Sequence, residues 1–249
     1  MAGDQLVTSV RRQLGLGRLL PLGGPGDGAW IAERAAVGVL REAVGALPGL
    51  RVGTVRLTLA DADAAPAPAV KAPPSALPPG PLRIEADFAA TAGRPVPASA
   101  GILREALLKC AAERVGLEVS AVDLRVTDLL GEDENEAGSG GGPGAGSAGG
   151  AGVRQSGGGA GGATAQDAGP LETAVLRVPG VVRLVPALGA LSRPVREEDG
   201  HVLVQLAVAP DRRTLDVTRA VRGAVEAAAT GDRPTVAVLV AALEPAAAS

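Results

Sequence analysis

One order of segments occurs twice in this chain, and it constrains the fold more than any other feature. Residues 47–50 read Leu-Pro-Gly-Leu and residues 178–181 read Val-Pro-Gly-Val, and each is followed by a strand-like apolar run. Each copy continues with an alternating segment, a helical segment ending at Gly116 or Gly231, and a valine-rich strand. We therefore predict an α+β fold of two small helix-strand-strand-helix-strand units, with helices packed on one face of short sheets.

Composition and periodicity give the predicted domain boundaries. Residues 1–28 form an N-terminal segment with a short amphipathic helix over 5–20, and residues 29–131 form the first unit, which includes a Pro-rich loop at 61–81. Residues 132–169 are acidic and then rich in Gly, Ser and Ala, which predicts a disordered linker before the second unit at 170–244.

Within each unit, apolar periodicity predicts the individual elements. The first unit has a helix from Ala29 to Leu47, strands over 50–60 and 82–90, a helix capped by Ser99 and a strand over 117–129. The second unit has a helix over 170–178, strands over 181–188, 201–209 and 234–242, and a helix over 213–230.

The core of such a fold must be built almost without aromatic side chains, which make up 1% of the chain. Val, Leu, Ile and Ala bury less area each, so each small unit is expected to be of modest stability and to gain from pairing or oligomerisation. The only lysines are Lys71 and Lys109, and this preference for Arg, with much Ala, Gly, Pro and Val, is typical of a GC-rich genome of actinobacterial type.

Several short motifs, taken in order, resemble the alkaline shock protein family of Gram-positive bacteria, which are small cell-envelope stress proteins. They are Ile-Ala-Glu at 31–33 in the first helix, Pro-Gly at 48–49 before a strand, and Gly-Leu-Glu-Val at 116–119 leading into Val-Asp-Leu-Arg-Val at 122–126. The second copy repeats the Pro-Gly at 179–180 but has Asp-Arg-Pro after Gly231. The resemblance implies a non-enzymatic protein that self-associates or binds an envelope-linked partner, and it carries over no catalytic residue.

Reactive groups are sparse in the sequence. Cys110 lies on the apolar stripe of a predicted helix and is expected to be a buried, inert thiol, while His201 is expected at an exposed turn. One Cys and one His cannot make a structural zinc site, and the carboxylate groups at 61–63, 85–87 and 197–199 are expected to be solvated. With no dinucleotide or phosphate-loop motif, we predict no enzyme, no metal and no cofactor.

Arginines make one helix of the second unit basic. Arg213, Arg219 and Arg222, with Arg233 nearby, are candidate contacts for a polyanion or an acidic partner, and a solvated helix face is the simpler interpretation. A nucleic-acid-binding module that uses this helix is the alternative function, although the net charge of -3 and the lack of aromatic stacking residues do not favour it.

The expected partner is therefore a protein, either a second copy or an envelope-associated one. No apolar run is long enough to span a bilayer, so we expect a cytoplasmic chain. Peripheral contact with the inner face of the membrane stays open through the N-terminal helix.

Overall fold

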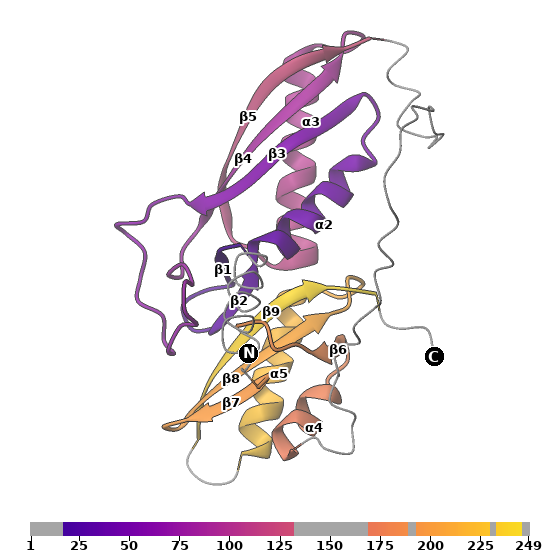
Figure 1. Cartoon of the computed structure of the whole chain (residues 1–249). Coiled ribbons are helices and arrows are strands. Elements are labelled where there is room, and N and C mark those ends of the chain that lie inside the picture. The colour runs from indigo at the N-terminus through magenta and orange to yellow at the C-terminus, as the bar shows by residue number, and fades with distance from the viewer. Residues whose placement is uncertain (1–16, 132–168, 189–192, 230–232, 246–249) are drawn as a thin grey trace, which may run out of the picture.

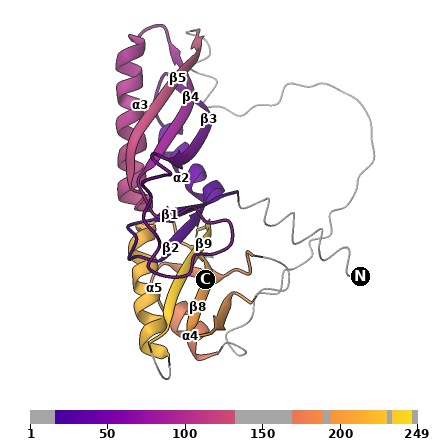
Figure 2. The same ribbon diagram turned by 90° about the vertical axis from the view of Figure 1, so that its left-hand side faces the viewer.

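The computed structural model describes residues 17–131, 169–188, 193–229 and 233–245. These residues form a mixed α+β structure with two sheets (Figure 1), so the predicted class is confirmed. One cluster of buried apolar side chains contains residues of both sheets and of the helices that pack on them. Turned by 90°, the molecule shows helices α3 and α5 one above the other along one side (Figure 2).

The first sheet has the order β3-β4-β5. Its strands are β3 (Leu50–Leu59), β4 (Leu82–Thr91) and β5 (Val119–Leu130); β3 pairs antiparallel with β4, and β5 pairs parallel with β4. Helix α2 (Glu33–Gly45), helix α3 (Val96–Cys110) and the π-helical turn η1 (Ala111–Val115) accompany it. Leu40 and Val44 of α2 and Leu103 and Leu107 of α3 are buried at helical spacing, which holds these helices against the apolar side of the sheet.

The second sheet contains β6 (Val181–Leu184), β7 (Val195–Glu198), β8 (His201–Val208) and β9 (Thr235–Leu243). Strand β8 pairs antiparallel with β6 and β7 and parallel with β9. Helices α4 (Pro170–Leu176) and α5 (Thr214–Ala228) accompany this sheet, and Val217, Val221 and Val225 of α5 belong to the same buried cluster as the valines of β8 and β9.

Two strands from the start of the chain extend the second sheet. Strand β1 (Leu19–Leu22) pairs antiparallel with β2 (Ala29–Ala32), and β2 pairs parallel with β9. The prediction of a helix from Ala29 is therefore wrong at its start, since the helix begins at Glu33. The cause is tertiary, because all four residues of β2 are buried in a sheet where β2 pairs with β9, about 200 residues further along the chain.

The proline-rich stretch packs on part of the face of the second sheet that lies opposite its helices. Residues 61–81 carry no helix or strand, as predicted, apart from an isolated bridge between Ala76 and Leu19. Val70 packs in a cluster with Trp30 of β2, and the Trp30 indole N–H donates to the Leu77 carbonyl oxygen at 3.1 Å. The stretch thus shields the one tryptophan of the chain from water.

Most predicted elements are confirmed to within a few residues, with three further corrections. Ser99 does not cap α3, because the helix already begins at Val96 after Pro95, and Ser99 is buried in its first turn. Strand β7 was not predicted, so Glu197 and Glu198 lie in a strand that turns into β8 through Asp199 and Gly200, both with positive φ. The strand predicted over 181–188 ends at Leu184.

Two predictions fall wholly or mainly outside the described residues. The N-terminal helix over 5–20 lies almost entirely in residues 1–16, and its last two residues are part of strand β1. The linker at 132–169 likewise lies outside, except for Gly169, which precedes α4. Among the described helices, none is both long and apolar enough to cross a membrane.

Candidate functional site

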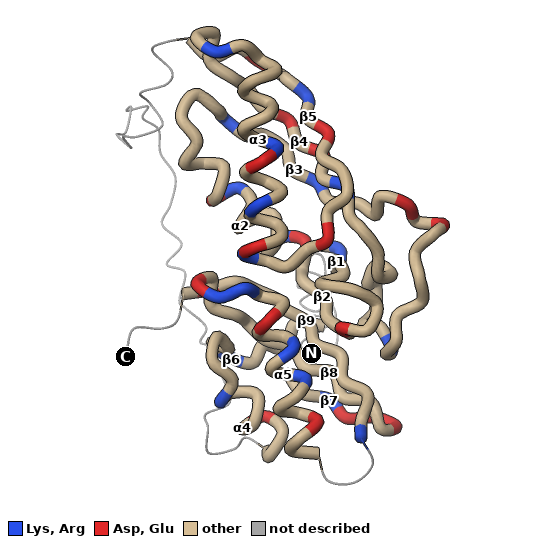
Figure 3. Tube along the Cα trace, turned by 180° about the vertical axis from the view of Figure 1, so that it is seen from behind, with Lys and Arg blue, Asp and Glu red and all other residues tan. Residues whose placement is uncertain are grey.

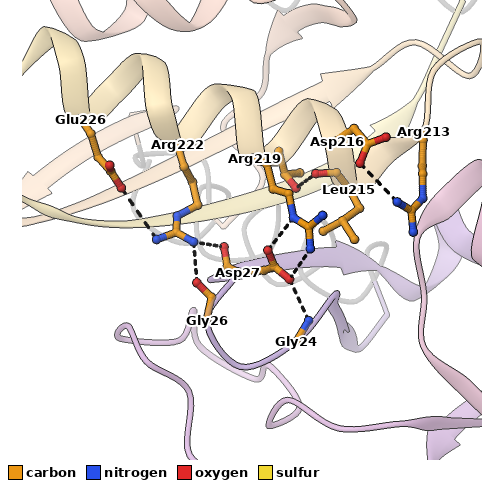
Figure 4. A network of polar contacts seen from close by, with 10 residues as sticks. Gly24, Gly26, Asp27, Arg213, Leu215, Asp216, Arg219, Arg222 and Glu226 are labelled. Carbon is orange, nitrogen blue, oxygen red and sulfur yellow. Dashed lines mark hydrogen bonds and ion pairs between the residues drawn. The ribbon is translucent and has the colours of Figure 1, made fainter.

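The arginines of α5 bind a loop from the start of the chain (Figure 4). Arg219 makes a bidentate ion pair with Asp27, with Nε to Oδ1 at 2.7 Å and Nη2 to Oδ2 at 3.1 Å. Arg222 donates through Nη1 to the carbonyl oxygens of Gly26 and Asp27, both at 2.6 Å, and lies near Glu226. These two predicted site residues therefore connect α5 to the loop that joins β1 to β2.

The loop itself is shaped to present Asp27. Its Oδ2 also accepts the backbone N–H of Gly24 at 2.8 Å, and the Asp27 N–H closes a turn onto the Gly24 carbonyl. Gly23 has a φ of +76°, and a Cβ there would overlap the Asp27 carboxylate, so this position requires glycine. Hydrogen bonding from Arg219, with help from the Gly24 N–H and against partial burial, lowers the pKa of Asp27.

Arg213 is the residue before the N-terminus of α5, where this helix meets η1. Its Nε donates to the Ala112 carbonyl oxygen at 2.9 Å, and the Thr214 hydroxyl donates to the Arg114 carbonyl oxygen at 3.4 Å. Both acceptors belong to the last helical turn before Gly116. The positive N-terminal end of α5 thus meets the negative C-terminal end of η1, an arrangement that aligns the two helix dipoles favourably.

The four predicted arginines do not form one basic surface. Arg219 and Arg222 share the loop at 23–28, Arg213 contacts η1, and Arg233 is exposed in the segment before β9, with no ion pair to any residue in the described ranges. Seen from behind, basic and acidic residues are interspersed over both halves (Figure 3). This arrangement adds nothing in favour of the nucleic-acid alternative. The partner of Arg219 was missed because nothing local in the sequence links it to Asp27, 192 residues away.

The lone histidine and the lone cysteine both have structural surroundings. His201 Nδ1 lies 2.8 Å from the Thr235 hydroxyl across the β8–β9 pair, and burial, together with the charge of Lys71, lowers the pKa of His201. Cys110 is buried as predicted, and burial raises its thiol pKa. No group of His, Cys, Asp and Glu side chains within the described ranges could hold a metal ion.

The exposed large apolar side chains lie on two neighbouring elements, α3 and β5. Within the described part of the chain they are Ile102 of α3 and Val126 and Leu129 of β5, with 38%, 39% and 58% of their surfaces exposed. Helix α3 packs directly against β5. We call the exposed part of this region, made up of Ile102 of α3 and residues 125–129 of β5, the β5 surface. Exposed apolar side chains on neighbouring elements are candidates for a contact surface.

The two edges of the first sheet differ in how their backbone groups are satisfied. On β3, the Leu57 carbonyl accepts from Arg18 at 2.7 Å, and the Leu57 N–H lies 3.5 Å from Glu33 Oε1. The Gly53 carbonyl accepts from Arg41 at 3.0 Å. On β5, Arg104 reaches the Val122 carbonyl at 3.4 Å. Side chains thus cover part of the β3 edge and the beginning of the β5 edge.

Beyond Val122 the edge of β5 has no strand beside it among the described residues, since β5 pairs with β4 alone. By contrast, the outer edge of β9 is paired with β2 over Val238–Val240. The strands at the remaining edges of the second sheet, β1, β6 and β7, are each only four residues long. The β5 edge is therefore the long open edge of the described structure.

Comparisons with protein-family models, with curated proteins and with solved structures found no match to this chain.

Proposed function

We propose that this chain is a non-enzymatic interaction protein that acts by self-association or by binding another protein, as its resemblance to cell-envelope stress proteins implies. The observation that carries the proposal is the β5 surface, where an open strand edge and exposed apolar side chains occur together. An extended segment that pairs with this edge would satisfy backbone groups and bury apolar area in one step. The arginines of α5, by contrast, are engaged within the chain.

We also infer that the two sheets are divergent copies of one unit. Both combine an antiparallel and a parallel neighbour around a central strand, β4 or β8. Both parallel pairs also shift register near the end of the central strand. The shift follows Phe88, which pairs with Val126, in the first sheet and Leu206, which pairs with Val240, in the second. In this alignment β5 corresponds to β9.

Corresponding turns support the same inference. Gly49 and Gly180, which precede β3 and β6, have φ values of +74° and +99°. The carbonyl of each accepts a backbone N–H from the end of the central strand, from Thr91 in the first sheet and from Ala209 in the second. Unrelated units would have no reason to share these details together with the register shift.

Site-specific photo-crosslinking in cells that produce the protein tests the proposed function. A photoreactive phenylalanine analogue at Leu129 should give covalent adducts with a protein, either a second copy or another chain. The matched control is the same analogue at Arg34, an exposed position on α2, which should give far fewer adducts. Equal or absent crosslinking at the two positions would contradict a contact function for the β5 surface.

A further inference from the structure

The backbone of β5 has a defined outward side. The Val122 carbonyl accepts from a side chain of α3, so it points away from β4. Because backbone groups alternate along a strand, Leu124 and Val126 also direct their N–H and C=O groups outward. Thr127 is an extra residue at the register shift, since Phe88 pairs with Val126 and Ala89 with Asp128. After this bulge the outward position passes to Leu129, whose N–H is held by its neighbour Asp128 at 2.8 Å rather than by β4.

Because the bulge adds one residue at Thr127, the outward-facing positions of β5 are arranged symmetrically about Val126. Leu124 and Leu129 are the outward residues on either side of it. Arg125 and Asp128 flank it on the opposite sheet face, where they lie beside Asp87 and Ala89 of β4. The Arg125 side chain is 76% exposed, although it donates through Nε and Nη2 to the Asp87 carboxylate of its own chain at 2.8 and 3.1 Å. It carries the charge opposite to that of Asp128. Such an edge is complementary to itself when its direction is reversed.

We propose that two copies of this chain associate by antiparallel pairing of their β5 edges about a two-fold axis at Val126. Each Val126 then exchanges backbone hydrogen bonds with the partner's Val126, and each Leu124 pairs with the partner's Leu129. Arg125 lies opposite the partner's Asp128, and this charge pair occurs twice because the contact is isologous. The inference rests on the proposed function and names its partner as a second copy.

This pairing accounts for the exposed groups of the β5 surface. Leu129 and Val126, which are open to water in the single chain, become part of a continuous sheet. In the dimer the outward Leu129 N–H no longer bonds to the Asp128 carboxylate but donates to the partner's Leu124 carbonyl. The Asp128 carboxylate then faces the partner's Arg125. Opposite charges placed directly across an antiparallel pair stabilise it, and like charges destabilise it.

Charge exchange tests the register. Sedimentation velocity of the full chain should show a concentration-dependent dimer. Arg125→Asp alone and Asp128→Arg alone each place like charges opposite one another twice, so each should weaken the dimer by about 10- to 100-fold. An equimolar mixture of the two variants should restore dimers close to wild-type strength. The control Arg51→Asp on β3 should dimerise as wild type does. Restoration in the mixture would also show that both variants are folded.

A disulfide test is independent of charge. Val126→Cys should form an oxidised dimer readily, because directly opposed residues in a hydrogen-bonded antiparallel pair have Cα atoms about 5.5 Å apart, within the range of a disulfide. Position 129 is more exposed, but in this register it lies roughly 14 Å from position 129 of the partner chain. Leu129→Cys should therefore not form an oxidised dimer.

The outcomes separate this inference from the proposed function. A monomeric wild-type chain, single charge variants that dimerise normally, or a mixture that does not recover would each overturn pairing about Val126. If Leu129 nevertheless crosslinks to another protein, the β5 surface keeps its contact function with a different partner.

Discussion

Gly116 lies where the two halves of the molecule meet, and replacing it with alanine should destabilise the whole chain. The residue ends η1 in the left-handed conformation, with a φ of +90°, and its N–H bonds to the Ala111 carbonyl at 2.8 Å. A Cβ at this position would overlap the Cβ of Leu215 in α5 and lie 3.1 Å from its Cδ2. Because the nearest atom is a Cβ close to the backbone, a rotamer change cannot relieve the overlap.

The expected cost of Gly116→Ala has two parts. Holding an alanine in the left-handed conformation costs about 1–2 kcal/mol. Forcing an extra methyl group into a packed contact costs about 1–3 kcal/mol more. The free energy of unfolding should therefore fall by roughly 2–5 kcal/mol. For a chain of this size, a loss near 3 kcal/mol lowers Tm by roughly 6–12 °C.

Urea unfolding followed by circular dichroism measures this effect. The matched control is Gly223→Ala, an exposed position in the interior of α5 where a Cβ meets no atom within 4 Å. That change should stabilise the protein by about 0.5–1 kcal/mol, because alanine is the better helix former. If Gly116→Ala unfolds at the wild-type urea concentration, η1 and α5 do not pack as described, and the reasoning is refuted.

Two further predictions concern the ties between the halves. Asp27→Asn should cost at most about 1 kcal/mol at pH 7, because Arg219 is half exposed. Arg219 lowers the pKa of Asp27 in the folded chain. This stabilisation is therefore complete above the unfolded carboxyl pKa of about 4 and is lost as the pH falls through the lower folded pKa. The urea midpoints of the wild-type protein and of Asp27→Asn should converge in acid. Cleavage at a protease site inserted within 138–162 should leave the two fragments together on size-exclusion chromatography, because β2 pairs with β9 and Arg219 holds Asp27. Fragments that separate without denaturant would contradict these ties.

The parts of the fold that local chemistry determines could be predicted from the sequence. Apolar residues at helical spacing located α2, α3 and α5, and strict alternation located β4 and β8. Gly116 was correctly expected at the end of a helix, where the structure shows it in the left-handed conformation. Such signals depend only on near neighbours, so they remain readable without knowledge of the tertiary structure.

The contacts that join distant segments could not be predicted in this way. Residues 29–32 read as the start of a helix because they directly precede α2, yet β9 draws them into a sheet. The arginine spacing at 219 and 222 indicated a shared helix face but not the loop that covers it. The bulge at Thr127, which makes the β5 edge self-complementary, exists only relative to β4 and leaves no mark in the sequence of β5 alone.

The position of β1 and β2 in the chain explains why the outer edge of β9 is closed while the outer edge of β5 is open among the described residues. Strand β2 runs directly into α2 and pairs with β9, and Val240 of β9 is fully buried, whereas Val126 of β5 is 39% exposed. The β3 edge is covered in part by Arg18, Glu33 and Arg41. Pairing of two chains through β5 would therefore use the long open edge of each. Because that edge is then satisfied in both copies, assembly should stop at the dimer rather than continue into a fibre.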